Sequence, residues 1–155
     1  MAHSRIFEVS WEPLPESDWV GADEFTENGF VGSVADYTVG INEEERHKSV
    51  ERLNKHVLGT LEIVPEGSNY KLTLLPNGKE EYFGHRLNSL KSLIYNMSIE
   101  EFCRDVVAFQ MQEEINKRHS FYIYSDGYYQ TLDNFIRDLN EGEVYYICGV
   151  IDYHM

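Results

Sequence analysis

The chain has 155 residues, of which 42% are hydrophobic and 14% aromatic, and its formal net charge is −14. This length fits one domain with a continuous core, and the apolar content excludes a disordered chain, in which high charge accompanies few apolar residues. The excess of acid disfavours direct binding of nucleic acid, because a polyphosphate must be neutralised by Lys and Arg. We expect a single domain over residues 1–155.

The first predicted element is a strand. Residues 5–12 alternate between apolar and polar, with Glu8 and Glu12 on the polar side, which is typical of a half-exposed strand that ends at Pro13. The acidic segment, residues 13–41, follows and contains four glycines among scattered aromatics. We expect short helical turns near residues 20–26 and 31–37, and long irregular segments in compact domains are often functional.

A helix and a meander are expected next. Asn42 and Glu45 have the spacing of an N-cap and its reciprocal partner, which predicts an amphipathic helix over residues 43–57. The stretches TLEIVP and YKLTLL have the composition of strands, and a turn at Asn77-Gly78 leads into KEEYF as a third strand. These strands predict an antiparallel meander.

The apolar pattern changes to a helical period after Phe83, and Ser98 with Glu101 has capping-box spacing. A helix is therefore expected to begin at residue 98 and to run to about Arg118, with four apolar side chains buried along one face. These side chains are Ile99, Phe102, Cys103 and Val106.

The C-terminal third predicts a strand, a helix and a strand, which are FYIYS, residues 131–139 and EVYYICGVID. The last strand is apolar on both faces, which indicates a central position in a covered sheet. The expected fold class is α+β: a single domain with a mixed, largely antiparallel sheet of about 5–6 strands and helices packed on it.

The location is predicted from what the sequence lacks. No N-terminal stretch combines a basic head with an apolar run, and the longest apolar run, Val144–Ile151, is far shorter than the ~20 residues of a membrane span. Cys103 and Cys148 form no CxxC pair, so reduced core thiols are expected, although a single disulfide is also compatible with the sequence. We expect a cytoplasmic protein without membrane contact.

Asp152 and His154 lie two residues apart on one face of the final strand, where a carboxylate can orient an imidazole as a general base. The competing interpretation is a solvated histidine near a chain end, and no GxSxG nucleophile elbow is found. We therefore assign no catalytic residue and keep an Asp152–His154 site as the alternative.

The remaining candidates favour structure over chemistry. His47 forms a column with Glu43 and Glu51 on its helix, but without a second histidine or an HExxH pattern a solvated face is favoured over a metal site. No phosphate-binding glycine motif is found, so we predict no metal and no cofactor. Three histidines stand in separate predicted elements with no spacing that relates them: His56, His85 and His119.

The negative charge is concentrated in the N-terminal part. From Ile6 to Glu45 the sequence contains 11 carboxylates and neither Lys nor Arg, whereas residues 46–118 have a net charge of +1 and residues 119–155 one of −5. A surface field of one sign influences which partners bind and how fast they associate. A surface that served only solubility would mix both signs of charge. The predicted partner-binding residues are Glu12, Glu16, Asp18, Trp19, Asp23, Glu24, Phe25, Glu27 and Asp36, with the two aromatics as anchors.

The predicted function is that of a non-catalytic acidic binding protein. Its expected partner is a basic nucleic-acid-handling protein such as a nuclease, as for a nucleic-acid-mimic-like inhibitor of the anti-restriction, anti-CRISPR or nuclease-immunity type. Two alternatives stay open, a small enzyme with an Asp152/His154 site and an acidic soluble interaction domain with another role. The sequence leaves the oligomeric state undetermined.

Overall fold

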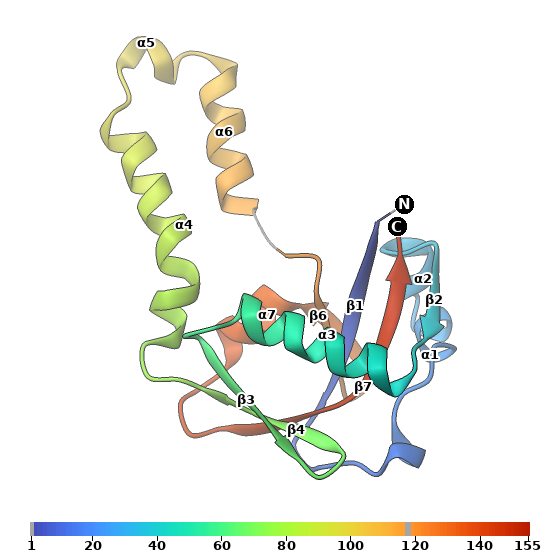
Figure 1. Cartoon of the computed structure of the whole chain (residues 1–155). Coiled ribbons are helices and arrows are strands. Elements are labelled where there is room, and N and C mark those ends of the chain that lie inside the picture. Colours follow the sequence, from blue (N-terminus) through green and yellow to red (C-terminus); the bar gives the residue numbers. More distant parts are fainter. Residues whose placement is uncertain (1, 117–118) are drawn as a thin grey trace.

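The computed structural model of the chain describes residues 2–116 and 119–155, and within them the strands form one seven-stranded mixed sheet (Figure 1). The strand order is β3-β4-β7-β1-β5-β6, and β2 pairs with β7. The α+β class is confirmed, with seven strands in place of five or six. The strands are β1 His3–Ser10, β2 Tyr37–Gly40, β3 Leu61–Glu66, β4 Asn69–Leu74, β5 Tyr122–Ser125, β6 Tyr128–Thr131 and β7 Val144–His154.

Strand β7 is the centre of the sheet, as its apolar sequence predicts. One edge of β7 pairs with β1, and the other edge pairs with β4 near its beginning and with β2 near its end. The β1–β5 pair is parallel, and the other pairs are antiparallel. The first and last strands therefore lie side by side, and both ends of the chain meet at one edge of the molecule (Figure 1).

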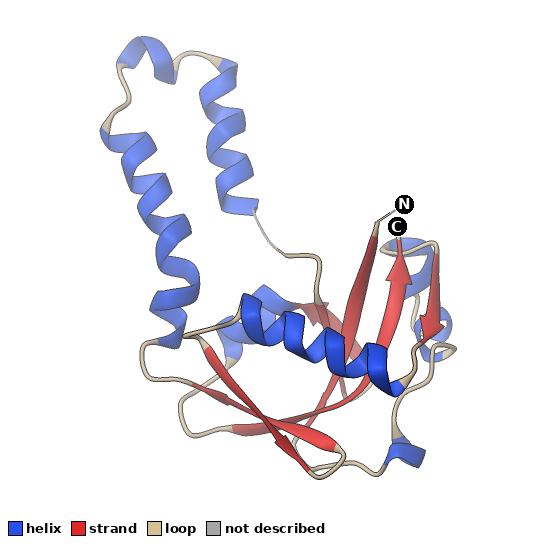
Figure 2. Ribbon diagram, in the orientation of Figure 1, coloured by secondary structure: helices blue, strands red, loops and turns tan. Residues whose placement is uncertain are grey.

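Helices cover both faces of the sheet (Figure 2). Helices α3 and α7 pack over the larger core cluster, and α1 with α2 packs over the smaller one. None of the described helices has the length and apolar content needed to cross a membrane. The helices are η1 Glu16–Asp18, α1 Glu24–Glu27, α2 Phe30–Ser33, α3 Glu43–His56, α4 Gly78–Tyr95, α5 Ile99–Phe102, α6 Asp105–Asn116 and α7 Leu132–Asp138.

The predicted helix starts are confirmed by their caps. The side chain of Asn42 accepts a hydrogen bond from the Glu45 amide at 2.8 Å, and Ser98 accepts one from the Glu101 amide at 3.1 Å. Each bond satisfies a backbone donor that the first helical turn leaves without a partner. Local sequence therefore determines where α3 and α5 begin.

The predicted third strand of the meander is wrong, because KEEYF lies in the first turns of α4. Asn77 has a left-handed backbone with φ of 59°, and α4 begins at the next residue, Gly78. The helix starts close to the sheet: a Cβ atom on Gly78 would lie 2.4 Å from the carbonyl oxygen of Thr60. The turn thus redirects the chain into a helix instead of a hairpin.

Helices α4, α5 and α6, residues 78–116, form a helical arm that projects from the body, by which we mean the sheet with α1, α2, α3 and α7 (Figure 1). The predicted continuous helix is wrong, because α5 and α6 are separate, and its predicted end at Arg118 lies outside the described residues. Helix α6 packs against α4. The four side chains predicted to be buried are therefore exposed: Ile99, Phe102, Cys103 and Val106.

The β1–β7 pair contains a β-bulge beside Glu8. From Phe7 to Val9, β1 advances two residues while its partners on β7 change by three, from Val150 to Ile147. A bulge leaves backbone groups without their ladder partners. Glu8, predicted to face solvent, is buried at this point because β1 is a central strand covered on both faces.

Two buried charged side chains form hydrogen bonds with backbone groups at the bulge. The carboxylate of Glu8 accepts hydrogen bonds from the Gly149 amide at 3.1 Å and from the Val20 amide at 2.8 Å. Arg46 of α3, which is 4% exposed, donates through Nε to the Cys148 carbonyl at 2.8 Å. Burial raises the pKa of Glu8, while both amides and the nearby Arg46 oppose that rise.

Replacement of Glu8 tests this arrangement. Glu8→Ala leaves the buried Gly149 amide and the partly buried Val20 amide without an acceptor. We therefore expect the free energy of unfolding, measured by urea denaturation, to fall by ~2 kcal/mol. The matched control is Glu12→Ala, which removes an exposed glutamate four residues further along the chain. We expect it to change the free energy of unfolding by no more than about 0.5 kcal/mol. Equal effects of the two substitutions would contradict the assignment of Glu8.

Candidate functional site

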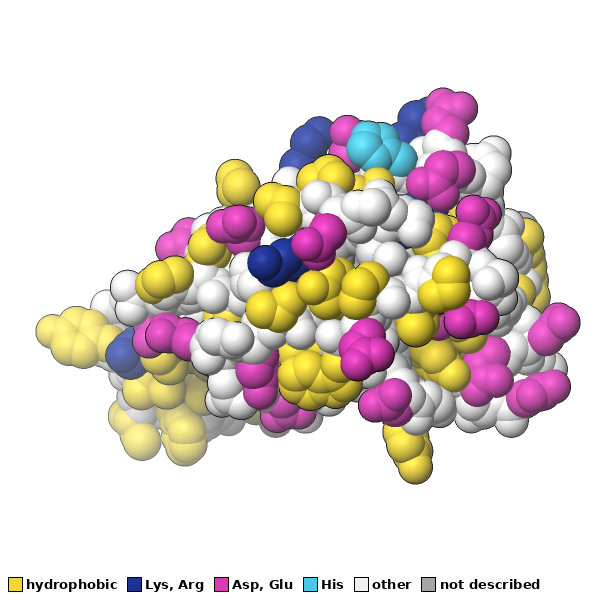
Figure 3. Space-filling view, turned by 90° about the horizontal axis from the view of Figure 1, so that it is seen from below, with side chains coloured by type: hydrophobic (Ala, Val, Ile, Leu, Met, Phe, Trp, Pro, Cys, Tyr) yellow, Lys and Arg dark blue, Asp and Glu magenta, His cyan; other side chains and the backbone are white. Residues whose placement is uncertain are grey.

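The predicted acidic face is largely open to solvent. Six of its seven carboxylates are exposed: Glu12, Glu16, Asp18, Asp23, Glu27 and Asp36. In the part of the chain that the structure describes, none of the six forms an ion pair. The seventh, Glu24, is partly buried and accepts a hydrogen bond from the Tyr124 hydroxyl at 3.0 Å. Figure 3 shows Asp and Glu side chains gathered on the right of the face seen from below, the side on which Figure 1 places α1, α2 and β2.

The predicted anchor Phe25 is buried inside the body. Its exposed fraction is 0%, and its ring centroid lies 5.1 Å from that of Tyr124 and 5.8 Å from that of Phe30. Phe30 is also fully buried and contacts Tyr153 edge to face. Phe25 therefore fixes α1 to the sheet, and its ring is not presented to a partner.

The other predicted anchor, Trp19, is partly buried over Arg46. The guanidinium carbon lies 4.1 Å from the centroid of the indole ring, which is a cation–π contact. The indole nitrogen donates to the Leu14 carbonyl at 3.1 Å. Trp19 thus shields the buried arginine and closes the loop between β1 and α1.

Asp152 and His154 belong to a strand-end cluster with His3 and Arg5. The register places His3 opposite His154 and Arg5 opposite Asp152, and directly opposite residues project from the same face. Asp152 Oδ2 lies 3.0 Å from His154 Nε2 and 3.2 Å from His3 Nδ1, and Arg5 binds Oδ1. The expectation of a solvated terminal histidine is wrong, because His154 is 6% exposed.

Both ring nitrogens of His154 have partners. Nε2 faces Asp152, and Nδ1 lies 2.8 Å from the Tyr37 hydroxyl, whose ring stacks on the imidazole. Burial lowers the pKa of His154, and the nearby His3 and Arg5 lower it further. Both nitrogens of His154 thus bind neighbours, and neither is free to act as a general base.

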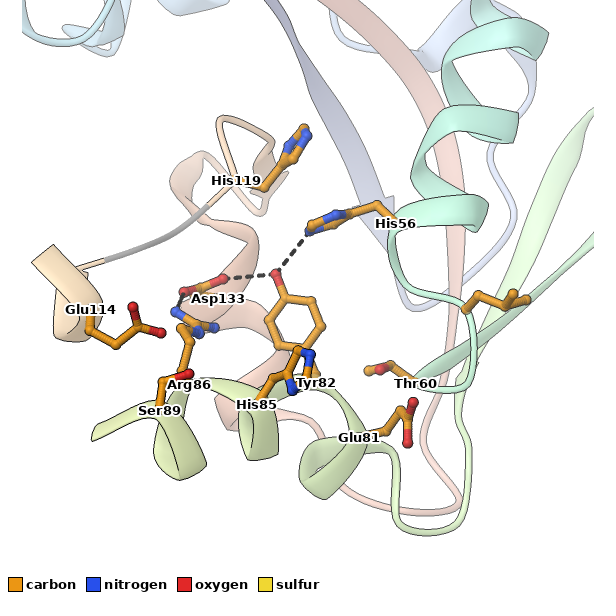
Figure 4. Close-up of a pocket in the computed structure, with 11 residues that line it drawn as sticks. His56, Thr60, Glu81, Tyr82, His85, Arg86, Ser89, Glu114, His119 and Asp133 are labelled. Atoms are coloured by element: carbon orange, nitrogen blue, oxygen red, sulfur yellow. Dashed lines mark hydrogen bonds and ion pairs between the residues drawn. The ribbon is translucent and has the colours of Figure 1, made fainter. Parts of the chain in front are cut away.

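A cavity of about 500 Å³ lies where the helical arm joins the body (Figure 4). The end of α3, the first turns of α4, the end of α6 and α7 all contribute to its wall. Its lining residues are His56, Leu58, Thr60, Glu81, Tyr82, His85, Arg86, Ser89, Glu114, His119 and Asp133.

Tyr82 connects the polar groups of this cavity. Its hydroxyl donates to Asp133 Oδ1 at 2.8 Å and lies 3.3 Å from His56 Nε2 (Figure 4). Arg86 binds the other carboxylate oxygen of Asp133 at 2.6 Å, and Asp133 is buried. Burial and the bond to Asp133 raise the pKa of Tyr82, so its hydroxyl stays protonated as a donor.

The three histidines without a common spacing meet at this cavity, which sequence reasoning missed. The ring centroids of His56 and His119 are 4.2 Å apart, and His85 stands on α4 nearby. Partial burial lowers the pKa of His56 and that of His119. The cavity therefore offers imidazoles, a guanidinium and a hydroxyl to a small polar ligand. No sequence signal relates the three histidines, because His56 is on α3, His85 is on α4 and His119 lies in the segment before β5.

The helical arm exposes many large apolar side chains. Each of the following is more than half exposed: Leu87, Ile94, Tyr95, Ile99, Phe102, Val106, Phe109 and Ile115. Soluble monomers seldom expose extended apolar patches, and such patches mark contact surfaces. The arm is thus a second candidate surface for protein contacts.

Two further sequence candidates have structural roles. The predicted column of Glu43, His47 and Glu51 does not form one site. His47 Nε2 lies 3.3 Å from Glu51, whereas Glu43 binds Arg46. Both cysteines are free thiols. Cys148 is buried, and burial raises its pKa to about 11, as expected for an unreactive core thiol.

Comparisons with protein-family models, curated proteins and solved structures found no match. The candidate functional sites therefore come from the structure itself, and they are the acidic face, the strand-end cluster, the cavity and the helical arm.

The cavity histidines predict a pH dependence of stability. Because folding lowers the pKa of His56 and of His119 below about 6.5, the unfolded chain binds protons first as the pH falls. We therefore expect the free energy of unfolding to decrease from pH 7.5 to pH ~5.5, and to decrease less in the double variant His56→Gln/His119→Gln. The measurement is urea denaturation at a series of pH values. His85→Gln is the control, and an identical pH slope in the double variant would contradict the prediction.

Proposed function

We propose that the protein is a non-catalytic acidic binding protein of the cytoplasm that engages a basic nucleic-acid-handling protein through its acidic face. One observation carries the proposal: six exposed carboxylates between residues 12 and 36 have no cationic partner among the described residues. Within the described residues their charge is not neutralised by an ion pair, so it is available to a partner.

The electrostatics favour a basic partner. A surface field extends over about one Debye length, ~8 Å at physiological ionic strength, and so acts before contact. Complementary charge accelerates association and disfavours acidic partners. Proteins that handle nucleic acid expose Lys and Arg where phosphates bind, and carboxylates can occupy such a site in place of phosphates.

The acidic face is held on the sheet by buried contacts, which supports a binding role. Phe25 and Phe30 hold α1 and α2 on the sheet, and Glu8 holds the backbone of Val20. A surface that is ordered before binding loses less conformational entropy on association. The buried aromatics thus contribute order to the acidic face, while the exposed carboxylates would make the contacts.

Binding to a basic partner through an acidic face fits two roles equally well. One is an antagonist of restriction or CRISPR machinery, and the other is an immunity protein against a nuclease toxin. The small-enzyme alternative is less favoured, because both nitrogens of His154 have partners and Arg5 holds one oxygen of Asp152. The binding proposal therefore takes precedence over chemistry at the strand-end cluster.

Charge reversal combined with affinity capture tests the proposal. The tagged chain is incubated with nuclease-treated native lysate, washed at low and at high salt, and the bound proteins are identified by mass spectrometry. We expect a basic nucleic-acid enzyme to be retained at low salt and released at high salt. The variant Asp23→Lys/Glu27→Lys/Asp36→Lys is expected to lose it.

A matched variant separates the acidic face from total charge. Glu62→Lys/Glu80→Lys/Asp138→Lys changes the net charge equally at three exposed positions outside residues 12–36, and it should retain the partner. Recovery of no basic partner, or equal loss from both triple variants, would contradict the proposed function.

A further inference from the structure

Three metal-ligating side chains converge where the first and last strands pair. His3 stands opposite His154, and Asp152 precedes His154 by two residues, so all three project from the same face of the sheet. Their ligand atoms lie within 4.8 Å of one another. We infer that His3, Asp152 and His154 form a binding site for a divalent transition-metal ion of the Zn²⁺ class.

The distances suit a shared ion. Both imidazole nitrogens approach the same carboxylate oxygen, with Asp152 Oδ2 3.2 Å from His3 Nδ1 and 3.0 Å from His154 Nε2. Two ligand atoms on a tetrahedral Zn²⁺ are about 3.3–3.5 Å apart, given bond lengths of ~2.0–2.2 Å. Each of these two distances is therefore within a few tenths of an ångström of the spacing in a coordination sphere, and all three ligand atoms lie within 4.8 Å of one another.

Neighbouring side chains orient the ligands. The Tyr37 hydroxyl lies 2.8 Å from Nδ1 of His154, the nitrogen that does not face Asp152. Arg5 binds the other oxygen of Asp152, and Arg5 itself donates to Ser49 at 2.9 Å. Metal-binding histidines and carboxylates are commonly held by such outer hydrogen bonds.

The donor set selects the class of ion. Two imidazoles and one carboxylate suit Zn²⁺ and its neighbours, whereas Mg²⁺ and Ca²⁺ prefer oxygen ligands. Arg5 offsets the charge of Asp152, so the attraction rests on the two nitrogen donors and on the chain's net charge of −14. His3 is half exposed, so water can reach the ion and complete its coordination.

Metal binding at this site joins the two ends of the chain. His3 lies at the beginning of β1, and the other two ligands lie at the end of β7. An ion that binds the folded but not the unfolded chain stabilises the fold, and the stabilisation grows with the logarithm of the ion concentration above the dissociation constant. The three ligands include none of the carboxylates of the acidic face, so the test of the site does not depend on the proposed function.

The test is a titration of untagged, chelator-treated protein with Zn²⁺, followed by calorimetry and by the midpoint of thermal unfolding. We expect one ion per chain and a higher midpoint. His3→Ala, at a half-exposed position, is expected to weaken binding by at least ~100-fold, and Tyr37→Phe by ~10–100-fold. Circular dichroism confirms that each variant is folded.

Two control variants address other histidines. His85→Ala changes the cavity and His47→Ala changes α3, and both should bind Zn²⁺ as the unaltered chain does. The competing explanation is a hydrogen-bonded cluster without an ion. It predicts no saturable binding, or binding that His3→Ala leaves unchanged, and either result would overturn the inference.

Discussion

The structure depends on two buried charged side chains at the bulge in β7. Glu8 accepts a hydrogen bond from the Gly149 amide, and Arg46 donates one to the Cys148 carbonyl. Both backbone groups lie at the bulge, where the register between β1 and β7 shifts, and both therefore have partners. The same carboxylate accepts the Val20 amide, and Trp19 covers the guanidinium. Because unsatisfied buried polar groups are costly, the acidic segment cannot leave the sheet without exposing this arrangement.

The two faces of the β1–β7 pair give rise to different candidate sites. On one face, Ile6 of β1 packs with the aromatics of α1 and α2, and Glu8 binds the Val20 amide. These contacts hold the segment that bears the exposed carboxylates. On the other face, the core under α3 gives way at the strand ends to a polar cluster around His3 and His154. The helical arm lies away from both, and its base forms the cavity around Tyr82.

Local patterns in the sequence predicted much of the fold and little of its sites. The side chains of Asn42 and Ser98 each cap a backbone amide only three residues further on, so both helix starts could be found from local sequence. The burial of Glu8 depends on the pairing of residues more than 140 positions apart, which alternation cannot reveal. The meeting of His56 with His119, and of His3 with His154, likewise follows from tertiary packing. The exposed arm escaped prediction because its apolar spacing is that of a buried helix.

The central claim is that the acidic face is preformed on the free chain, held by Glu8, Phe25 and Phe30. Amide hydrogen exchange of the free chain, followed peptide by peptide with mass spectrometry, tests it most directly. The account predicts that peptides from residues 20–36 exchange slowly, at rates close to those of β1 and β7. Exchange of residues 20–36 at the rate of an unstructured chain, while β7 stays protected, would contradict it.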